Sequence, residues 1–463
     1  MSSIAREDSP RRPRDARRAG ERTLTIGNPR DTAPASLPAS ASDGGREALR
    51  WAASGAMALT GHASGPPRLA PGRVVTRADA LLDALRADAP DPARLPADAG
   101  ALLGERAAIA GLARHGRTSA GGRARLLRTG DGWLALQLAR PDDVALLPAW
   151  LETDAERFRG DPWPAVAAAV ADRSAAPLVA RARSMGLPAA PLGAPSDGDV
   201  PPALRVTRPG TPRRRHDGPW RVIDLSSLWA GPLATHLLAA LGARVVKVES
   251  CARADGARRG PAPFLDLLNA DKESAALDFG TSEGREALRR LVAWADLVVE
   301  SARPRALAQL GFDAGALLAE HPGLAWLSIT GYGRPDPGGG WAAFGDDAAV
   351  AGALVARDED GAPLFCGDAI ADPLAGLHAA GAAARALRGG GGALVDVSLC
   401  GVAADAAAGA VDPRVSVVCD GDGHRVVHEG GTVAVAPPRA RRAAGPARAL
   451  GADTAAVLRE VGR

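Results

Sequence analysis

The feature that most constrains this chain is an alternation of short apolar runs and helix-like runs in its second half. Apolar runs of this length separated by helical stretches are typical of parallel strands joined by crossover helices. Helices are expected between them, for example at 231–243 and 282–295. The expected strands are RVIDLSS (221–227), ARVVKVES (243–250), DLVVES (296–301), LAWLSITG (324–331) and ALVDVSL (393–399). We therefore predict an α/β fold with a doubly wound parallel sheet.

Sheets of this kind bind ligands at the carboxyl ends of their strands. Here the strands run into LSSLWAGP, KVES, VVESARP and ITGYG, which are small or polar. The first of these, 225–232, leads into a helix whose N-terminus would favour an anion, although an ordinary turn also fits. The chain has neither GxGxxG nor GxxxxGKS, so a dinucleotide fingerprint and a P-loop are unsupported.

Two glycine-rich stretches, 333–341 and 388–396, are either phosphate cradles or turns. The second follows a helix instead of preceding one, which favours a turn.

Composition excludes several kinds of partner. Lys plus Arg is 56 and Asp plus Glu is 53, a net charge of +3, which gives no argument for nucleic acid or an anionic membrane. The four cysteines lack CxxC spacing and no long apolar run occurs, which favours a reducing cytoplasm without a membrane span. His236, His378 and His424 lack metal-ligand spacing, so no metal site is expected.

The stretch GDAIADPLAGLHAA (367–380) holds the most informative carboxylates. Asp372 precedes Pro373 and a helix-like run, so we expect it at the N-cap. The helix dipole would keep such a carboxylate ionised at neutral pH, so it could be a nucleophile, or it could only cap the helix. Gly376 would leave space beside it. Cys366 has no basic partner nearby in sequence and is a weak alternative.

Several segments of the second half together resemble the class III CoA-transferases, the CaiB/BaiF family. The similar segments are RVIDLSSLWAGPLATHLLAALGARVVKVES (221–250), NADKESAALDFGTSEGREAL (269–288), ADLVVESARPRALAQLGFD (295–313), LSITGYGRPDP (327–337), GGGGALVDVSL (389–399) and ALGADTAAVLREVG (449–462). The resemblance implies a Rossmann-like large domain with a smaller α+β domain. In the family the nucleophilic Asp stands four residues before a Gly, which selects Asp372 and not Asp368.

The resemblance also implies positions that contact CoA. Ser250 and Thr330 stand where relatives can carry basic residues, so Lys247 and Arg303 are added as nearby candidates for nucleotide contacts. The implied CoA-binding residues are Trp229, Ala230, Lys247, Ser250, Leu277, Asp278, Ser301, Arg303, Gly331 and Tyr332.

The implied activity is transfer of CoA from an acyl-CoA to a carboxylic acid through aspartyl anhydride and aspartyl-CoA intermediates. CoA is a substrate, no permanently bound cofactor is expected, and the protein is expected to be a homodimer. Racemases of the family pair the Asp with a His, but Asp346 occupies that position here. An isomerase using Asp372 with Asp346 or Asp347 stays an alternative, as does a non-catalytic CoA-binding protein.

The order of the segments departs from the family, because small-domain-like sequence comes first. We expect a fused, partly deleted tandem with one active site. Its parts are a disordered basic arm (1–45), a truncated and inactive large-domain segment (46–120), a small α+β domain (121–193), a linker (194–217), the CoA-binding catalytic domain (218–410) and a tail packed on the large domain (411–463).

Overall fold

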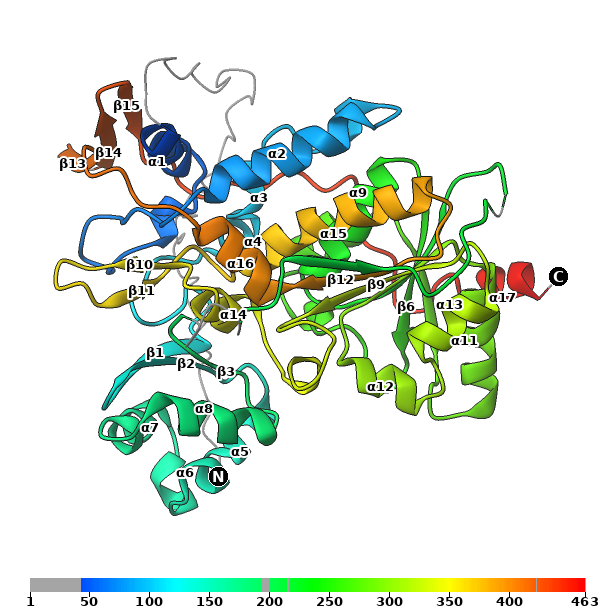
Figure 1. Cartoon of the computed structure of the whole chain (residues 1–463), viewed down its shortest axis with the longest axis horizontal. Helices are drawn as coiled ribbons and strands as arrows, with labels where there is room; N and C mark the ends of the chain where they lie inside the picture. The colour runs from blue at the N-terminus through cyan, green and yellow to red at the C-terminus, as the bar shows by residue number, and fades with distance from the viewer. Residues whose placement is uncertain (1–42, 194–199, 215, 422, 463) are drawn as a thin grey trace, which may run out of the picture. The chain divides into compact units, whose positions relative to one another are not determined.

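The computed structural model describes residues 43–193, 200–214, 216–421 and 423–462. In this part of the chain the central element is a seven-stranded sheet of order β4-β12-β9-β8-β5-β6-β7 (Figure 1). All neighbouring strands pair in parallel except β4 with β12. The strands are β4 (Leu204–Thr207), β5 (Arg221–Leu225), β6 (Arg244–Ser250), β7 (Glu273–Leu277), β8 (Leu297–Glu300), β9 (Ala325–Thr330) and β12 (Leu394–Ser398). The predicted parallel α/β sheet is confirmed. The predicted basic arm, 1–45, lies outside the described residues except for its last three.

Neither edge strand of the sheet, β4 or β7, was predicted from the sequence. Strand β4 falls inside the expected linker, 194–217, and pairs antiparallel with β12. Its residues are mostly exposed, and Val206 is 46% exposed. The sequence therefore lacks the apolar pattern by which a buried strand can be predicted. Strand β7 has the sequence ESAAL, which lacks the β-branched residues typical of strands.

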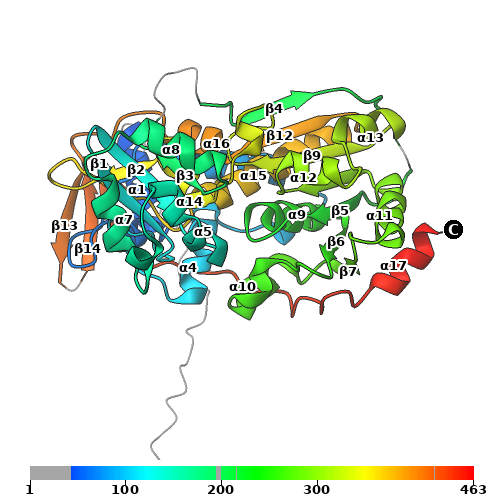
Figure 2. The ribbon, with the colours of Figure 1, turned by 90° about the horizontal axis from the view of Figure 1, so that it is seen from below.

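Helices cover both faces of the sheet (Figures 1 and 2). On one face α9 (Ala230–Ala240) and α15 (Ala371–Arg388) pack against each other and share one apolar core with the strands. On the other face α11 (Ser282–Trp294) and α13 (Ala314–Glu320) bury a second core that includes Trp326. Because crossover helices run back along a parallel sheet, their N-termini lie at the edge where the strands end.

Residues 124–191 form a smaller α+β unit with its own core. Strands β1 (Ala124–Thr129), β2 (Gly132–Gln137) and β3 (Ala189–Pro191) form an antiparallel sheet of order β1-β2-β3. Fully buried Trp150 lies in its core. The helices of the unit are α5 (Pro141–Ala145), α6 (Leu147–Leu151), α7 (Trp163–Val170) and α8 (Ala175–Ser184).

The segment before this unit packs into the large domain. It forms α1 (Asp43–Ala53), α2 (Val74–Ala87), α3 (Ala99–Leu102) and α4 (Glu105–Ala110). Its apolar residues, among them Trp51 and Leu82, belong to the same core cluster as α9 and α15. Helices α3 and α4 are short and are separated at Gly104.

The remaining elements complete the large domain and the tail. They are α10 (Ala262–Asn269), α12 (Pro304–Gln309), α14 (Gly345–Ala351), β10 (Val355–Arg357), β11 (Pro363–Phe365), α16 (Leu399–Ala407), β13 (Ser416–Asp420), β14 (Gly423–His428), β15 (Gly431–Ala434) and α17 (Thr454–Val461). Strands β14 and β15 contact α1, whereas α17 contacts β7 and α11. None of the helices in the described ranges combines the length and apolar character of a membrane span.

Candidate active site

Asp372 lies in the first turn of α15, at the edge where the parallel strands end. The helix begins at Ala371 and Ile370 occupies the cap, so the prediction that Asp372 is the N-cap is wrong. The chain turns one step earlier than expected, because Ala369 takes a left-handed φ of 43° and its carbonyl accepts a 2.8 Å hydrogen bond from the Asp372 N–H. Pro373 still falls within the first turn, where its missing N–H costs nothing.

The Asp372 carboxyl is only partly exposed, and its surroundings change its acidity. Burial raises its pKa from 3.8 to about 7. Arg106 and the N–H of Gly345 lower the pKa, while the carboxylates of Asp346 and Asp368 raise it. The expectation that Asp372 stays fully ionised at neutral pH is therefore wrong. Removal from water and two acidic neighbours outweigh the helix dipole.

The neighbouring Asp368 is fully buried and forms an ion pair with Arg106 of α4. The guanidinium binds both carboxylate oxygens, with a distance of 2.8 Å from Arg106 Nε to Asp368 Oδ2. The same guanidinium lies 5.7 Å from the ring centre of Trp229, a cation–π contact. Sequence analysis missed Arg106, because 262 residues separate it from Asp368 and no motif marks it.

Asp346 and Asp347 open α14 and hold the backbone around the site. Asp346 Oδ1 accepts a 2.9 Å hydrogen bond from the N–H of Ala369, and Asp347 Oδ1 accepts one of 2.8 Å from the N–H of Phe344. Both are buried, and burial raises their pKa values, to about 6 for Asp346 and about 7 for Asp347. A group of carboxyls that titrate near neutrality thus surrounds the start of α15.

The close packing of α9 on α15 brings the start of α9 against Gly376, one turn after Asp372. A Cβ on Gly376 would lie 2.9 Å from the Ala230 oxygen and 2.9 Å from Leu233 Cδ2. The expected space beside Gly376 is therefore filled by α9, and the glycine serves the close approach of the two helices. Trp229 is 2% exposed, and its indole N–H has no hydrogen-bond partner among the described residues.

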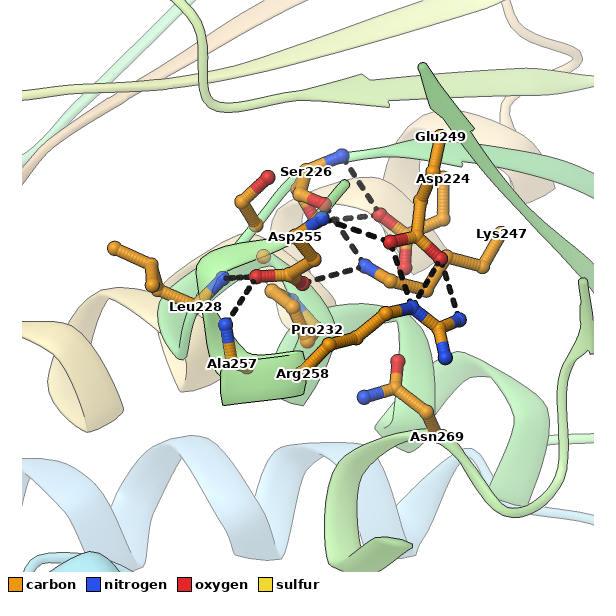
Figure 3. A network of polar contacts seen from close by, with 12 residues as sticks. Asp224, Ser226, Leu228, Pro232, Lys247, Glu249, Asp255, Ala257, Arg258 and Asn269 are labelled. Carbon is orange, nitrogen blue, oxygen red and sulfur yellow. Dashed lines mark hydrogen bonds and ion pairs between the residues drawn. The ribbon is translucent and has the colours of Figure 1, made fainter. Parts of the chain in front are cut away.

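The turn between β5 and α9 is braced by side chains from β5 itself, from the loop after β6 and from the residue after β8. Figure 3 shows the first two, Asp224 and Asp255. The N–H groups of three consecutive residues, Ser226, Ser227 and Leu228, donate to Asp224, Ser301 and Asp255 at distances of 2.9, 3.0 and 3.0 Å. Leu228 has a left-handed φ of 69° and is 41% exposed. These hydrogen bonds therefore fix the backbone of the turn, and the Leu228 side chain faces solvent.

Beneath this turn lies a network of buried charges (Figure 3). Lys247 Nζ lies 2.9 Å from Asp255 Oδ2 and donates to the Ser226 oxygen at 3.0 Å. Lys272 Nζ donates to Asp224 Oδ2 at 2.9 Å. These two residues are the only lysines in the sequence. The prediction that Lys247 contacts a nucleotide is wrong, because its side chain is 2% exposed and occupied in holding the turn.

The other predicted CoA-binding residues gather at the edge where the strands end. They are Ala230 after β5, Ser250 at the end of β6, Leu277 and Asp278 at the end of β7, Ser301 and Arg303 after β8, and Gly331 and Tyr332 after β9. Ala230, Leu277 and Tyr332 are buried, whereas Asp278 is exposed and the rest are partly exposed. Arg183 of α8 lies 4.3 Å from the Tyr332 ring centre, so the smaller unit contacts this edge.

Arg303 lacks a carboxylate partner in the described part of the chain. Burial and the nearby Arg305, Arg140 and Arg253 lower the pKa of Arg303. Such a group of positive charges, at the edge of the sheet where the parallel strands end, favours the binding of an anion.

Two other sequence features do not contribute to the site. Burial raises the pKa of Cys366 to about 12, which makes its thiol a poor nucleophile. The glycines 389–392 join α15 to β12 at the opposite edge of the sheet, so the expected turn is confirmed there. Within the described residues, no group of three or more His, Cys, Asp or Glu side chains is placed to hold a metal ion.

Comparison with known proteins identifies one family that is similar to the second half of the chain. The family model of CoA-transferase family III matches residues 219–417, which include the braced turn and Asp372. This part of the chain is similar to that family. The family resemblance seen in the sequence is thereby confirmed.

Individual relatives match over stretches of similar length. A succinate–glutarate CoA-transferase of Agrobacterium fabrum is 34% identical over 203 residues, which is 39% of this chain and 50% of that protein. A succinyl-CoA:glutarate CoA-transferase of Mus musculus is 32% identical over 192 residues, 39% of this chain and 44% of that protein. A CaiB/BaiF family protein from Brucella suis superimposes with a TM-score of 0.41 at 28% identity, over 47% of this chain and 67% of that one. The chain spans about half the length of the curated relatives it matches.

Proposed function

We propose that the protein transfers CoA from an acyl-CoA thioester to a carboxylic acid, with Asp372 as the nucleophile. The observation that carries this proposal is the partly exposed Asp372 carboxyl in the first turn of α15, a helix of the family III segment that packs against α9. Relatives that match about two fifths of this chain are named as transferases of CoA between acids. Asp372 also stands four residues before Gly376, the spacing expected of the family's nucleophile.

The proposed reaction has four steps. An Asp372 oxygen attacks the thioester carbon of the donor, the C–S bond breaks, and CoA leaves as thiolate from a mixed anhydride. The thiolate attacks the Asp372 carbonyl carbon, which releases the donor acid and leaves aspartyl-CoA. The acceptor carboxylate then attacks this thioester, which forms a second anhydride and again frees the thiolate. The thiolate finally attacks the acceptor acyl carbon, giving the new acyl-CoA and free Asp372.

The raised pKa of Asp372 fits this chemistry. The attacking species is the carboxylate, so transfer should rise with pH through about 7 and level off above it. A carboxylate with a raised pKa is also a stronger nucleophile than an ordinary one, because it is less stabilised by water. Partial burial of Asp372 would also keep water away from the anhydrides and so protect them from hydrolysis.

We propose that CoA lies along the strand ends that follow the braced turn. Arg303, with Arg253 and Arg305 nearby, would face its phosphates, since the turn N–H groups are already occupied by protein acceptors. The unpartnered indole N–H of Trp229 would be free for an acceptor on the ligand. Lys247 would act only by supporting the turn.

The decisive experiment is to trap the intermediates. The protein is incubated with hydroxylamine and a panel of acyl-CoA donors that starts with succinyl-CoA, and the modified peptide is mapped by mass spectrometry. Hydroxylamine converts an aspartyl anhydride or thioester into a hydroxamate, which we expect on Asp372. Transfer of CoA between acids without any modification of Asp372 would refute the covalent mechanism.

The isomerase alternative has one observation in its favour, the carboxyls of Asp346 and Asp347 that titrate near neutrality. It predicts incorporation of solvent deuterium at the α-carbon of an acyl-CoA without an acceptor acid, and transfer does not. Binding of acyl-CoA with neither activity would instead favour a non-catalytic CoA-binding protein. The homodimer and the cytoplasmic location expected from the sequence stay predictions.

Gly345 offers a sharp test of the placement of Asp372. A Cβ at this position would lie 2.4 Å from the Ala369 oxygen and 2.5 Å from Asp372 Oδ2. We expect Gly345→Ala to push the carboxyl aside and lower kcat for transfer about 10²-fold, the loss typical of an ångström-scale displacement. Gly445→Ala is the matched control, because a Cβ there meets nothing within 4 Å. Equal activity of both variants would show that Asp372 is not positioned by this contact.

A further inference from the structure

Three carboxyl groups and one guanidinium meet at the start of α15. Asp346 comes from α14, Asp368 and Asp372 from the turn and helix that follow β11, and Arg106 from α4. The charge of Arg106 acts on all three carboxyls. The helix α9, which also packs here, contributes the uncharged Trp229 and Ala230.

The guanidinium is held in one orientation. Both Asp368 oxygens accept hydrogen bonds from it, and the Trp229 ring lies 5.7 Å away. A planar guanidinium bound bidentately to a carboxylate is a directional contact that an ammonium cannot reproduce. Asp368 is fully buried, and a buried carboxylate of this kind depends on its counter-ion.

We propose that Arg106 is a positioning residue for the reaction of Asp372: it compensates Asp368 and supplies the positive charge beside which Asp372 ionises. This inference rests on the proposed function, because it assigns a partner to the nucleophile. Without Arg106, the three carboxyls would lie together in a largely buried site with no positive charge beside them. Like charges at short range oppose each other's ionisation, so Asp372 would ionise less readily.

The proposal changes the role of the amino-terminal segment, which the sequence analysis took for an inactive copy. Its residues also bind the end of β11 and the turn that follows it, at one point each. The N–H of Gly367 donates to Thr60 Oγ1 at 2.9 Å, and the N–H of Phe365 donates to the Gly116 oxygen at 3.0 Å. Segment 46–120 would thus complete the single active site of the chain, with Arg106 as its charged contribution.

The experiment measures the titration of Asp372 directly in the full-length protein. A small diazo compound esterifies carboxyl groups only in their protonated form, so labelling of Asp372, followed by peptide mass spectrometry over a pH series, reports its midpoint. We expect Arg106→Met to move the midpoint up by about one pH unit or more, because a favourable charge is lost. We expect Asp368→Asn to move it down, because a like charge is lost and Arg106 becomes uncompensated.

The double variant Arg106→Met/Asp368→Asn removes both charges and should return the midpoint toward that of the unmodified protein. Arg106→Lys keeps the positive charge but loses the bidentate contact, so it should raise the Asp372 midpoint less than Arg106→Met does. A purely structural role would lower stability in each variant without opposite shifts. Unchanged midpoints in both single variants would overturn the proposal.

The matched control is the exposed pair Arg77–Asp405, with a separation of 3.2 Å, where Arg77→Met and Asp405→Asn should leave the Asp372 midpoint unchanged. The readout needs no turnover, so it separates this inference from the proposed function. Failure to trap a hydroxamate while the opposite shifts occur would refute the nucleophile alone. Trapping with unchanged midpoints would refute only the role of Arg106.

Discussion

Replacing Asp372 by asparagine is expected to abolish transfer of CoA. Asparagine has nearly the size of aspartate but cannot form an anhydride, so kcat should fall by about 10³-fold or more. The fold should persist, because the change removes a carboxyl whose ionisation its surroundings already oppose. The measurements are chromatographic assay of the acyl-CoA products and thermal unfolding followed by circular dichroism.

Asp360→Asn is the matched control for this loss. Asp360 lies in the exposed turn between β10 and β11, so the same chemical change there should leave transfer within about twofold of the unmodified protein. Undiminished turnover in Asp372→Asn would contradict the proposed mechanism. Loss of activity accompanied by unfolding would be resolved by Asp372→Glu, which keeps the carboxyl but displaces it.

Replacing Lys272 by methionine is expected to cause the largest loss of stability. Its side chain is 1% exposed, and its ammonium donates to Asp224 Oδ2 at 2.9 Å, Thr235 Oγ1 at 2.7 Å and Asn269 Oδ1 at 3.0 Å. Methionine fills similar space but leaves these acceptors buried without their donor. Breaking a buried ion pair in this way lowers the free energy of unfolding by about 3–5 kcal/mol. Urea unfolding at neutral pH measures the loss.

The control for Lys272 is an exposed cation in another pair between distant segments. Arg388 pairs with Asp88, and their side chains are 34% and 50% exposed. Arg388→Met should cost no more than about 1 kcal/mol, because water already screens the pair. If Lys272→Met cost as little, the buried network would not support the turn as described.

The sequence predicted the parts of this fold that local pattern controls. The strands β5, β6, β8, β9 and β12 stand within two residues of their expected bounds, because each is a buried apolar run between helices. The edge strand β4 was missed for the opposite reason, since most of its residues face solvent. Asp372 was found by its spacing to Gly376, but not the start of its helix, which depends on the left-handed Ala369.

The electrostatics of the site depended on contacts that no local pattern encodes. Arg106 and Asp368 meet across 262 residues, so the pair exists only in the folded chain. The same holds for the raised pKa of Asp372, which follows from burial and from carboxyls on other elements. Lys247 was misassigned because a basic residue near a strand end resembles a ligand contact, whereas its side chain turns inward to Asp255.

The two buried lysines have a chemical consequence for a protein that meets acyl thioesters, as proposed here. Of the 56 basic residues only Lys247 and Lys272 carry a side-chain amine, and both ammonium groups are sequestered by carboxylates. The other basic residues are arginines, whose guanidinium stays protonated and does not react as a nucleophile at neutral pH. The surface thus offers thioesters and anhydrides almost no side-chain amine to acylate, so stray acyl transfer would be directed to water or thiols and not to the chain's own basic residues.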